Sequence, residues 1–307
     1  MSSAKQEIRR RYARPLMETK NKHGPNADHC GTPQSITIRS YTYKRRAVAE
    51  SSCMVCLERV PKHLVISVGE KVFLSLPGHL SVVSGHCLLT PYEHIGSTTR
   101  LDDCTIRELS AFKRQLVEMC KKQLNGSGCV FIENAVRIDS PRSHIQVDCI
   151  PVDGDVFDSL PAYFQATLSE IGSEWDQNRR VLRLKPGGMG AHGAVPPKLP
   201  YFAVEFGLLG GGLVRVIDDG RDIPSYFGRE IIGEVLGKNT HFWRKPKPES
   251  FERLCEKVVQ FEAWWTPFDN WSQRDPRGRS SAESRVDPVP PHPLTPEGPE
   301  LPPSLPS

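Results

Sequence analysis

Polar and apolar side chains alternate through the stretch 143–152, which reads Ser-His-Ile-Gln-Val-Asp-Cys-Ile-Pro-Val. As a β-strand it would present His144, Gln146 and Asp148 on one face and apolar side chains on the other. Alternation by itself predicts only a half-buried strand. A histidine, an amide and a carboxylate in one row, with a Cys-x-x-Cys motif far upstream at 53–56, indicate a metal site beside a polar pocket.

The Cys-x-x-Cys motif is a moderate zinc signal, because it fills only two of the four positions of a tetrahedral site. The sequence has no second Cys-x-x-Cys and no His-x3-His, so the fold would have to bring in isolated histidines. The candidates are His63, His79, His86, His94 and His144. Since His94 follows an expected strand and His144 lies on a polar strand face, we predict a structural zinc site of Cys53, Cys56, His94 and His144. The alternative, that both histidines are ordinary partly buried residues, fits the spacing equally well.

The elements that must position these side chains form an antiparallel sheet in the first half of the chain. Residues 63–68 and 71–77 flank the link Gly69-Glu70, which is typical of a hairpin with a type II′ turn. Further strands are expected over 85–95, 129–136 and 143–152, and one long helix over 101–124. The helix would be capped by Asp102 or Asp103 and would bury Ile106, Leu109, Phe112, Leu116 and Met119 or Cys120. This pattern predicts an α+β domain over 51–155.

A smaller α+β domain is expected over 156–271. Its predicted strands are 201–206 and 213–217, joined by a triple-glycine turn, and its predicted helices are 162–174, 226–236 and 250–265. The last helix carries an apolar stripe of Phe251, Leu254, Val258, Phe261 and Trp265. Together with Trp264, Phe268 and Trp271, this stripe favours core or interface over a platform for stacked bases. The glycine-rich stretch 186–200 has no strand before it and no Lys-Ser/Thr after it, so it is a flexible connection rather than a P-loop.

Both ends of the chain differ from this body in composition. Residues 1–50 hold eleven lysines and arginines against four acidic residues, a net charge of +7, and 272–307 hold ten prolines. We predict that both are disordered, and the basic arm suits electrostatic contact with nucleic acid or is simply solvated. The nine cysteines, an odd number without framework spacing, favour a reducing compartment. No apolar run approaches the roughly 18 residues of a spanning helix, so no membrane contact is expected.

The order of these motifs resembles known families. GHCLLTPYEHI, a long helix and then HIQVDCI at 144–150 resemble the histidine-triad (HIT) superfamily, whose motif is His-φ-His-φ-His-φ-φ. In its zinc-bearing branch, which includes galactose-1-phosphate uridylyltransferase-like proteins, the matching positions bind zinc, and this implies the four ligands named above. CMVCLERVPKHLVISVGEKVFLSLP, SGHCLLTPYEH, LPYFAVEFGLLGGGLVRVIDD, IPSYFGREIIGEVLG and FEAWWTPFDNW are similar to the paired C-terminal domains of the CwfJ family, over roughly 52–271.

The CwfJ resemblance implies a nuclear protein of the late or intron-lariat spliceosome. The implied partners are spliceosomal proteins, the lariat debranching enzyme and intron-lariat RNA. Candidate RNA-facing residues are Arg179, Arg180, Arg183, Lys185, Arg244, Lys245 and Lys247. Basic residues of this kind are more often merely solvated, so the assignment rests on the resemblance.

The chain departs from the catalytic pattern at the position that matters most. The middle histidine of HIT enzymes is the nucleophile, and here Gln146 stands in its place, with a neutral amide that is a poor nucleophile and no base near neutral pH. Asp148 stands at the third position, where a carboxylate would repel a phosphate. We therefore predict a non-catalytic, pseudo-HIT factor that binds RNA. The alternatives are a zinc-containing HIT-like nucleotide hydrolase or transferase with altered chemistry, and a scaffold that binds only protein.

Overall fold

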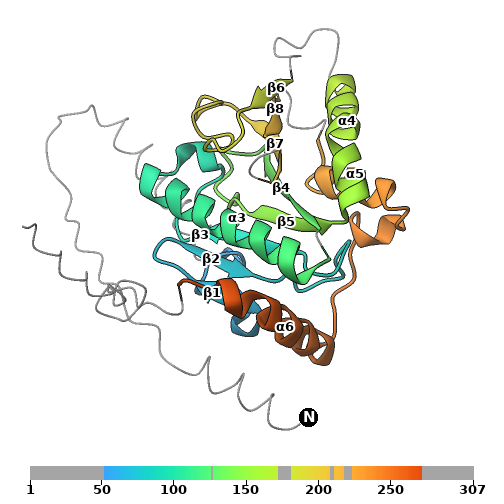
Figure 1. Ribbon diagram of the computed structural model, residues 1–307. Coiled ribbons are helices and arrows are strands. Elements are labelled where there is room, and N and C mark those ends of the chain that lie inside the picture. The colour runs from blue at the N-terminus through green and yellow to red at the C-terminus, as the bar shows by residue number, and fades with distance from the viewer. Residues whose placement is uncertain (1–51, 126, 172–180, 208–210, 218–222, 272–307) are drawn as a thin grey trace, which may run out of the picture. The chain divides into compact units, whose positions relative to one another are not determined.

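Eight strands form a single antiparallel sheet in the computed structural model, in the order β1-β2-β3-β5-β4-β7-β8-β6 (Figure 1). Their bounds are β1 Val65–Val68, β2 Val72–Ser75, β3 Cys87–Pro91, β4 Gly128–Ala135, β5 Val147–Val152, β6 Leu182–Leu184, β7 Tyr201–Phe206 and β8 Gly212–Val216. The predicted α+β class with an antiparallel sheet is confirmed. The structure describes residues 52–125, 127–171, 181–207, 211–217 and 223–271, so the predictions for 1–50 and 272–307 lie outside the described residues.

Four helices cover the two faces of this sheet. The helices are α3 Asp103–Gln123, α4 Gly154–Glu170, α5 Phe227–Val235 and α6 Phe251–Trp265, and short 3-10 helices are η1 Lys62–Leu64, η2 Thr98–Arg100, η3 Thr240–Phe242 and η4 Thr266–Phe268. One hydrophobic core contains residues of α3 and α6, and a second contains residues of α4 and α5. Among the described residues, no helix has both the length and the apolar character needed to cross a membrane.

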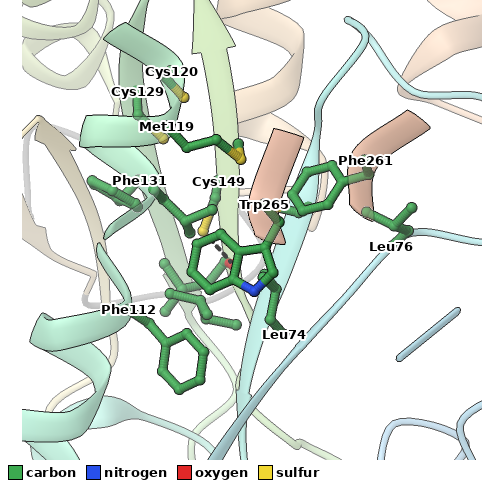
Figure 2. Packing of buried hydrophobic residues seen from close by; sticks show 14 of the residues in the cluster. Leu74, Leu76, Phe112, Met119, Cys120, Cys129, Phe131, Cys149, Phe261 and Trp265 are labelled. Atoms are coloured by element: carbon green, nitrogen blue, oxygen red, sulfur yellow. Dashed lines mark hydrogen bonds between the residues drawn. The ribbon is translucent and has the colours of Figure 1, made fainter. Parts of the chain in front are cut away.

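The core beneath α3 and α6 joins the two halves of the chain. Asp102 caps α3 by accepting a hydrogen bond from the backbone N–H of Thr105, at 2.6 Å. Figure 2 shows Trp265 of α6 at the centre of this core, and its ring stacks on Phe112 of α3 with a centroid distance of 6.1 Å. As predicted, the aromatic residues that close the second half pack together: Trp265 is buried in this core, and Trp264, Phe268 and Trp271 are partly buried against it. Phe251 differs from the prediction, because it begins α6 at the surface and remains 44% exposed.

The β1–β2 hairpin forms, but not with the predicted type II′ turn. The backbone N–H of Gly69 donates to the carbonyl of Val72 at 2.9 Å, so the turn residues are Glu70 and Lys71, and Gly69 does not have a positive φ. One oxygen of the Glu108 carboxylate accepts the backbone N–H groups of Lys71 and Val72, each at 3.0 Å. A side chain at position 69 would collide with this carboxylate. Glycine therefore serves the close approach of α3 rather than the backbone angle of the turn.

Helix α4 begins eight residues before its predicted start at Ala162. A proline lacks a backbone N–H and usually breaks a helix. Here Pro161 lies inside α4, and burial of Leu160, Phe164 and Leu168 against the sheet offsets the lost hydrogen bond. The last predicted residues of this helix, 172–174, lie outside the described residues.

The two predicted segments contribute to one sheet. Strand β4 pairs with β7 from Val130↔Phe206 to Ala135↔Tyr201, and the predicted boundary between 155 and 156 falls inside α4. Helix α6 returns to the core beside α3. The consequence for function is that side chains from both segments can reach the same site.

Candidate metal centre and basic cavity

The four predicted zinc ligands come together at one end of strands β3 and β5. Cys53 and Cys56 lie in the turns before η1, His94 follows β3, and His144 precedes β5. Because β3 and β5 are antiparallel neighbours, the end of one meets the beginning of the other. The ligand atoms of all four side chains lie within 4.8 Å of one another.

The hydrogen bonds of the two histidines leave the correct nitrogen for a metal. His94 Nε2 lies 2.9 Å from the carbonyl oxygen of Pro141, and His144 Nε2 lies 2.9 Å from that of Pro91. Since a carbonyl only accepts, each Nε2 carries the proton and each Nδ1 keeps a free electron pair. The Nδ1 atoms point toward the cysteines, with Cys56 Sγ at 3.4 Å from both.

The spacing of these donors fits a tetrahedral ion. With ordinary zinc bond lengths to sulfur and nitrogen, a tetrahedral site places the two ligand atoms about 3.5 Å apart. The sulfur-to-nitrogen distances here are 3.4 Å for Cys56 to His94 and 3.7 Å for Cys53 to His144. Four half-buried donors of this kind form a closed set without an open position for substrate, which is typical of a structural site.

A cavity of about 610 Å³, here called the basic cavity, adjoins the metal centre and shares His144 with it. The predicted row of polar residues is only partly a strand, because β5 begins at Val147. The extended conformation nevertheless continues before it, since Ile145 N–H donates to the carbonyl of Ile95 at 2.7 Å. Gln146 and Asp148 both line the cavity, as the alternation predicts.

Neither of these two residues is free for chemistry. The side-chain amide of Gln146 donates to Thr90 Oγ1 at 3.2 Å. Asp148 Oδ1 lies 2.8 Å from Nε2 of His86, a histidine that is only 1% exposed. Burial would raise the pKa of the Asp148 carboxyl, but this hydrogen bond and the charge of Arg229 outweigh burial, so the pKa is lowered. His86, one of the candidate metal ligands, is therefore the partner of Asp148.

Three arginines that sequence reasoning missed give the cavity its charge. Arg137 and Arg142 come from the connection between β4 and β5, and Arg229 comes from α5. Arg137 and Arg142 are exposed, and Arg229 is half-buried. The charge of Arg229 acts on the Asp148 carboxylate, and its Nε is buried without a hydrogen-bond partner among the described residues. Proximity to His144 in sequence could have indicated Arg137 and Arg142, but nothing local indicates Arg229.

The predicted RNA-facing residues lie elsewhere. Arg183 and Lys185 are exposed at β6, an edge strand of the sheet, and Arg244 is exposed after η3. Nε and Nη2 of Arg244 both donate to Glu230 Oε1, at 3.2 and 3.0 Å, so its charge is already paired. Lys245 and Lys247 are exposed nearby, and none of these five residues lines the basic cavity. Arg179 and Arg180 lie outside the described residues.

Comparison with known proteins identifies the family of this chain. The family model described as "Protein similar to CwfJ C-terminal" matches residues 40–165, and "Protein similar to CwfJ C-terminus 2" matches 174–271. The chain is 36% identical over 236 residues to CWF19-like protein 2 of Homo sapiens, covering 74% of this chain and 26% of that protein. It is 30% identical over 177 residues to pre-mRNA-splicing factor cwf19 of Schizosaccharomyces pombe, covering 55% of this chain and 27% of that one. It thus spans about a quarter of the length of these relatives.

Among solved structures, the Caenorhabditis elegans NitFhit protein overlaps 31% of this chain and 23% of its own, with a TM-score of 0.28 and 18% identity. This overlap is too small to bear on fold or function.

Proposed function

Because this chain belongs to the CwfJ family, we propose that it is a non-catalytic, zinc-stabilised factor in nuclear pre-mRNA splicing. The names of its relatives, CWF19-like protein 2 and pre-mRNA-splicing factor cwf19, support a splicing role. Its proposed partners are spliceosomal proteins, the lariat debranching enzyme and intron-lariat RNA. The segments 51–155 and 156–271 would act as the two CwfJ domains of one RNA-binding platform.

The proposal that the chain is non-catalytic rests on the hydrogen bonds that Gln146 and Asp148 make. An enzyme of the HIT type needs an imidazole where Gln146 donates its amide to Thr90. It also needs a site that accepts a phosphate, whereas the Asp148 carboxylate is engaged by buried His86. These contacts support a fold that is retained without its nucleophile.

Zinc is the proposed metal because two thiolates and two imidazoles suit it in a tetrahedral geometry. The ion would connect the residues before η1 to the ends of β3 and β5, and so stabilise this end of the sheet rather than activate a substrate. Metal analysis should give about one zinc per chain. The variant Cys53→Ser should lose the metal and unfold at a lower temperature, whereas Cys104→Ser, which changes an exposed cysteine outside the centre, should keep both. A wild-type chain that is fully folded without metal would contradict the proposal.

Purification of the tagged chain from nuclear extract tests the splicing role. We expect spliceosomal proteins and intron-lariat RNA in the purified material, and neither with the tag alone. Recovery of spliceosomal proteins without any RNA would favour the protein-binding scaffold over the RNA-binding platform. Recovery of neither would contradict the proposed function.

One contact favours the alternative of an enzyme with altered chemistry. His79 lines the basic cavity, and its Nδ1 lies 3.0 Å from the carbonyl of Leu80, which places the proton on Nδ1 and leaves Nε2 unprotonated. Such an imidazole could serve as a base or nucleophile. Incubation with dinucleoside polyphosphates, nucleotide sugars or capped RNA separates the two functions, because turnover that His79→Ala abolishes would support the enzyme.

A further inference from the structure

A second hollow, here called the α4–α5 groove, lies between helices α4 and α5, which pack against each other (Figure 1). Its volume is about 380 Å³, at the lower end of the range of ligand sites. Its lining includes Tyr163 and Thr167 of α4, and Phe227, Glu230, Ile231 and Glu234 of α5. None of these residues lines the basic cavity, so the groove is a separate feature of the surface.

The charged side chains in the lining of the groove are all acidic. Glu230 and Glu234 lie one helical turn apart on α5, where two like charges repel each other. The helix on the other side, α4, contains no lysine, arginine or histidine. Its acidic residues are exposed, and they are Asp155, Asp158 and Glu170. The groove and the surface beside it therefore attract positive charge.

One carboxylate of the groove already binds a guanidinium group of this chain. Nε and Nη2 of Arg244 donate to Glu230 Oε1 at 3.2 and 3.0 Å, and Trp243 Nε1 donates to the same oxygen at 3.3 Å. Glu234 is exposed and forms no ion pair within the described residues. The wall made by α5 thus holds one arginine and presents a second carboxylate to the groove.

The aromatic side chains of the groove favour arginine over lysine as the incoming cation. Tyr163 is 53% exposed, which is a large fraction for an aromatic side chain. A guanidinium group can stack on such a ring while it donates to a carboxylate, whereas an ammonium group has no plane to stack. Phe227 and Ile231 are almost fully buried and form an apolar floor that the methylene stem of an arginine can cover.

We propose that the α4–α5 groove is a docking site for an arginine-rich segment of a partner protein. One guanidinium group of the partner stacks on Tyr163 and donates to Glu234, and neighbouring arginines lie over the acidic surface of α4. RNA does not fit this surface, because its phosphates are repelled by the carboxylates. The inference goes beyond the proposed function, since it names the chemistry of a protein partner and rests neither on RNA binding nor on the metal.

Binding measurements on the full chain with matched variants test the proposal. The probe is a fluorescein-labelled peptide of alternating arginine and glycine, followed by anisotropy at about 0.15 M salt. Glu234→Gln and Tyr163→Ala should each lower affinity about threefold to fivefold, and the double variant about tenfold. Tyr163→Phe keeps the ring and should bind as wild type does. The control Glu118→Gln removes one exposed carboxylate from α3 and should change affinity by less than about twofold.

Two further arms of the experiment test the identity of the occupant. A peptide with lysine in place of arginine should bind about threefold more weakly, and equal binding would overturn the assignment of a guanidinium group. The other arm replaces the basic triplets 9–11 and 44–46 of the same chain by glutamine. Unchanged affinity for the peptide supports a partner protein, whereas a tenfold gain would show that the chain's own arm occupies the groove and would overturn the partner.

Groove variants that lose no more affinity than Glu118→Gln overturn the docking site itself. These measurements involve neither RNA nor the metal content of the chain. Their failure would therefore leave the proposed function standing, and a failure to recover spliceosomal proteins or RNA would leave the groove to be judged by its own variants.

Discussion

The two faces of the central sheet differ in whether their charged side chains are paired within the chain. On the face covered by α3, Lys113 Nζ lies 2.6 Å from Glu205 Oε1, and both side chains are largely buried. Nearby, Glu133 accepts hydrogen bonds from Thr98 N–H and Thr98 Oγ1, each at 2.8 Å, and from the hydroxyl of Tyr201. On the opposite face, the basic cavity is lined by three arginines and one carboxylate, that of Asp148, which is hydrogen bonded to His86.

This difference distinguishes buried charges that are paired within the chain from charges that line an open cavity. Burial lowers the pKa of Lys113, but the charge and hydrogen bond of Glu205 outweigh it, and the pKa is raised. Burial also raises the pKa of the Glu133 carboxyl. Both groups tolerate burial because each has its partners within the chain. The cavity arginines line an accessible site instead, where a partner can come from outside.

The largest expected loss of stability comes from breaking the ion pair of Lys113 and Glu205 on the face covered by α3. Lys113→Met leaves Glu205 buried without its counter-ion and should lower the free energy of unfolding by about 3–5 kcal/mol. Urea denaturation measures this loss. The double variant Lys113→Met/Glu205→Leu should recover most of it, because no uncompensated charge then remains. A single variant as stable as wild type would show that the pair does not hold the fold.

The pair of Asp148 and His86 should have an intermediate effect. Asp148→Leu removes the partner of buried His86 and should cost about 1–3 kcal/mol, whereas Asp148→Asn keeps an acceptor and should cost less. Both values come from urea denaturation at neutral pH. Equal stability of all three proteins would contradict the assignment of a buried partner.

This pair also predicts a pH dependence. The pKa of Asp148 is lower in the folded chain than the ordinary value of 3.8, so the ionised carboxylate contributes stability above that pH. The contribution is lost as pH falls through the lower folded pKa. The stability difference between wild type and Asp148→Asn should thus be constant near neutrality and shrink below about pH 4. A difference that grows below about pH 4 would contradict this sign.

The smallest effect on stability is expected when arginines of the basic cavity are removed. Arg137→Ala/Arg142→Ala removes two charges that hold no partner in the described chain, and the free energy of unfolding should stay within about 0.5 kcal/mol of wild type. A large loss of stability would place these arginines among the charges that hold the fold.

Sequence reasoning predicted most of the local elements and the cluster of candidate metal ligands, for physical reasons. Alternation and helical periodicity report which face of an element is buried, and the ends of antiparallel strands β3 and β5 must meet, which places His94 beside His144. The basic cavity could not be predicted from the sequence, because the neighbours of Arg229 in the fold are distant from it in sequence. The β4–β7 pairing likewise joins segments that are distant in sequence. Helix α4 continues through Pro161 because burial of its apolar side chains offsets the lost hydrogen bond.

Crosslinking of the chain to RNA in cells, with mass spectrometry of the crosslinked peptides, tests most directly the proposal that this chain binds RNA. We expect nucleotides crosslinked to peptides within 52–271. A complete absence of crosslinks, or crosslinks confined to the basic arm 1–50, would contradict the account.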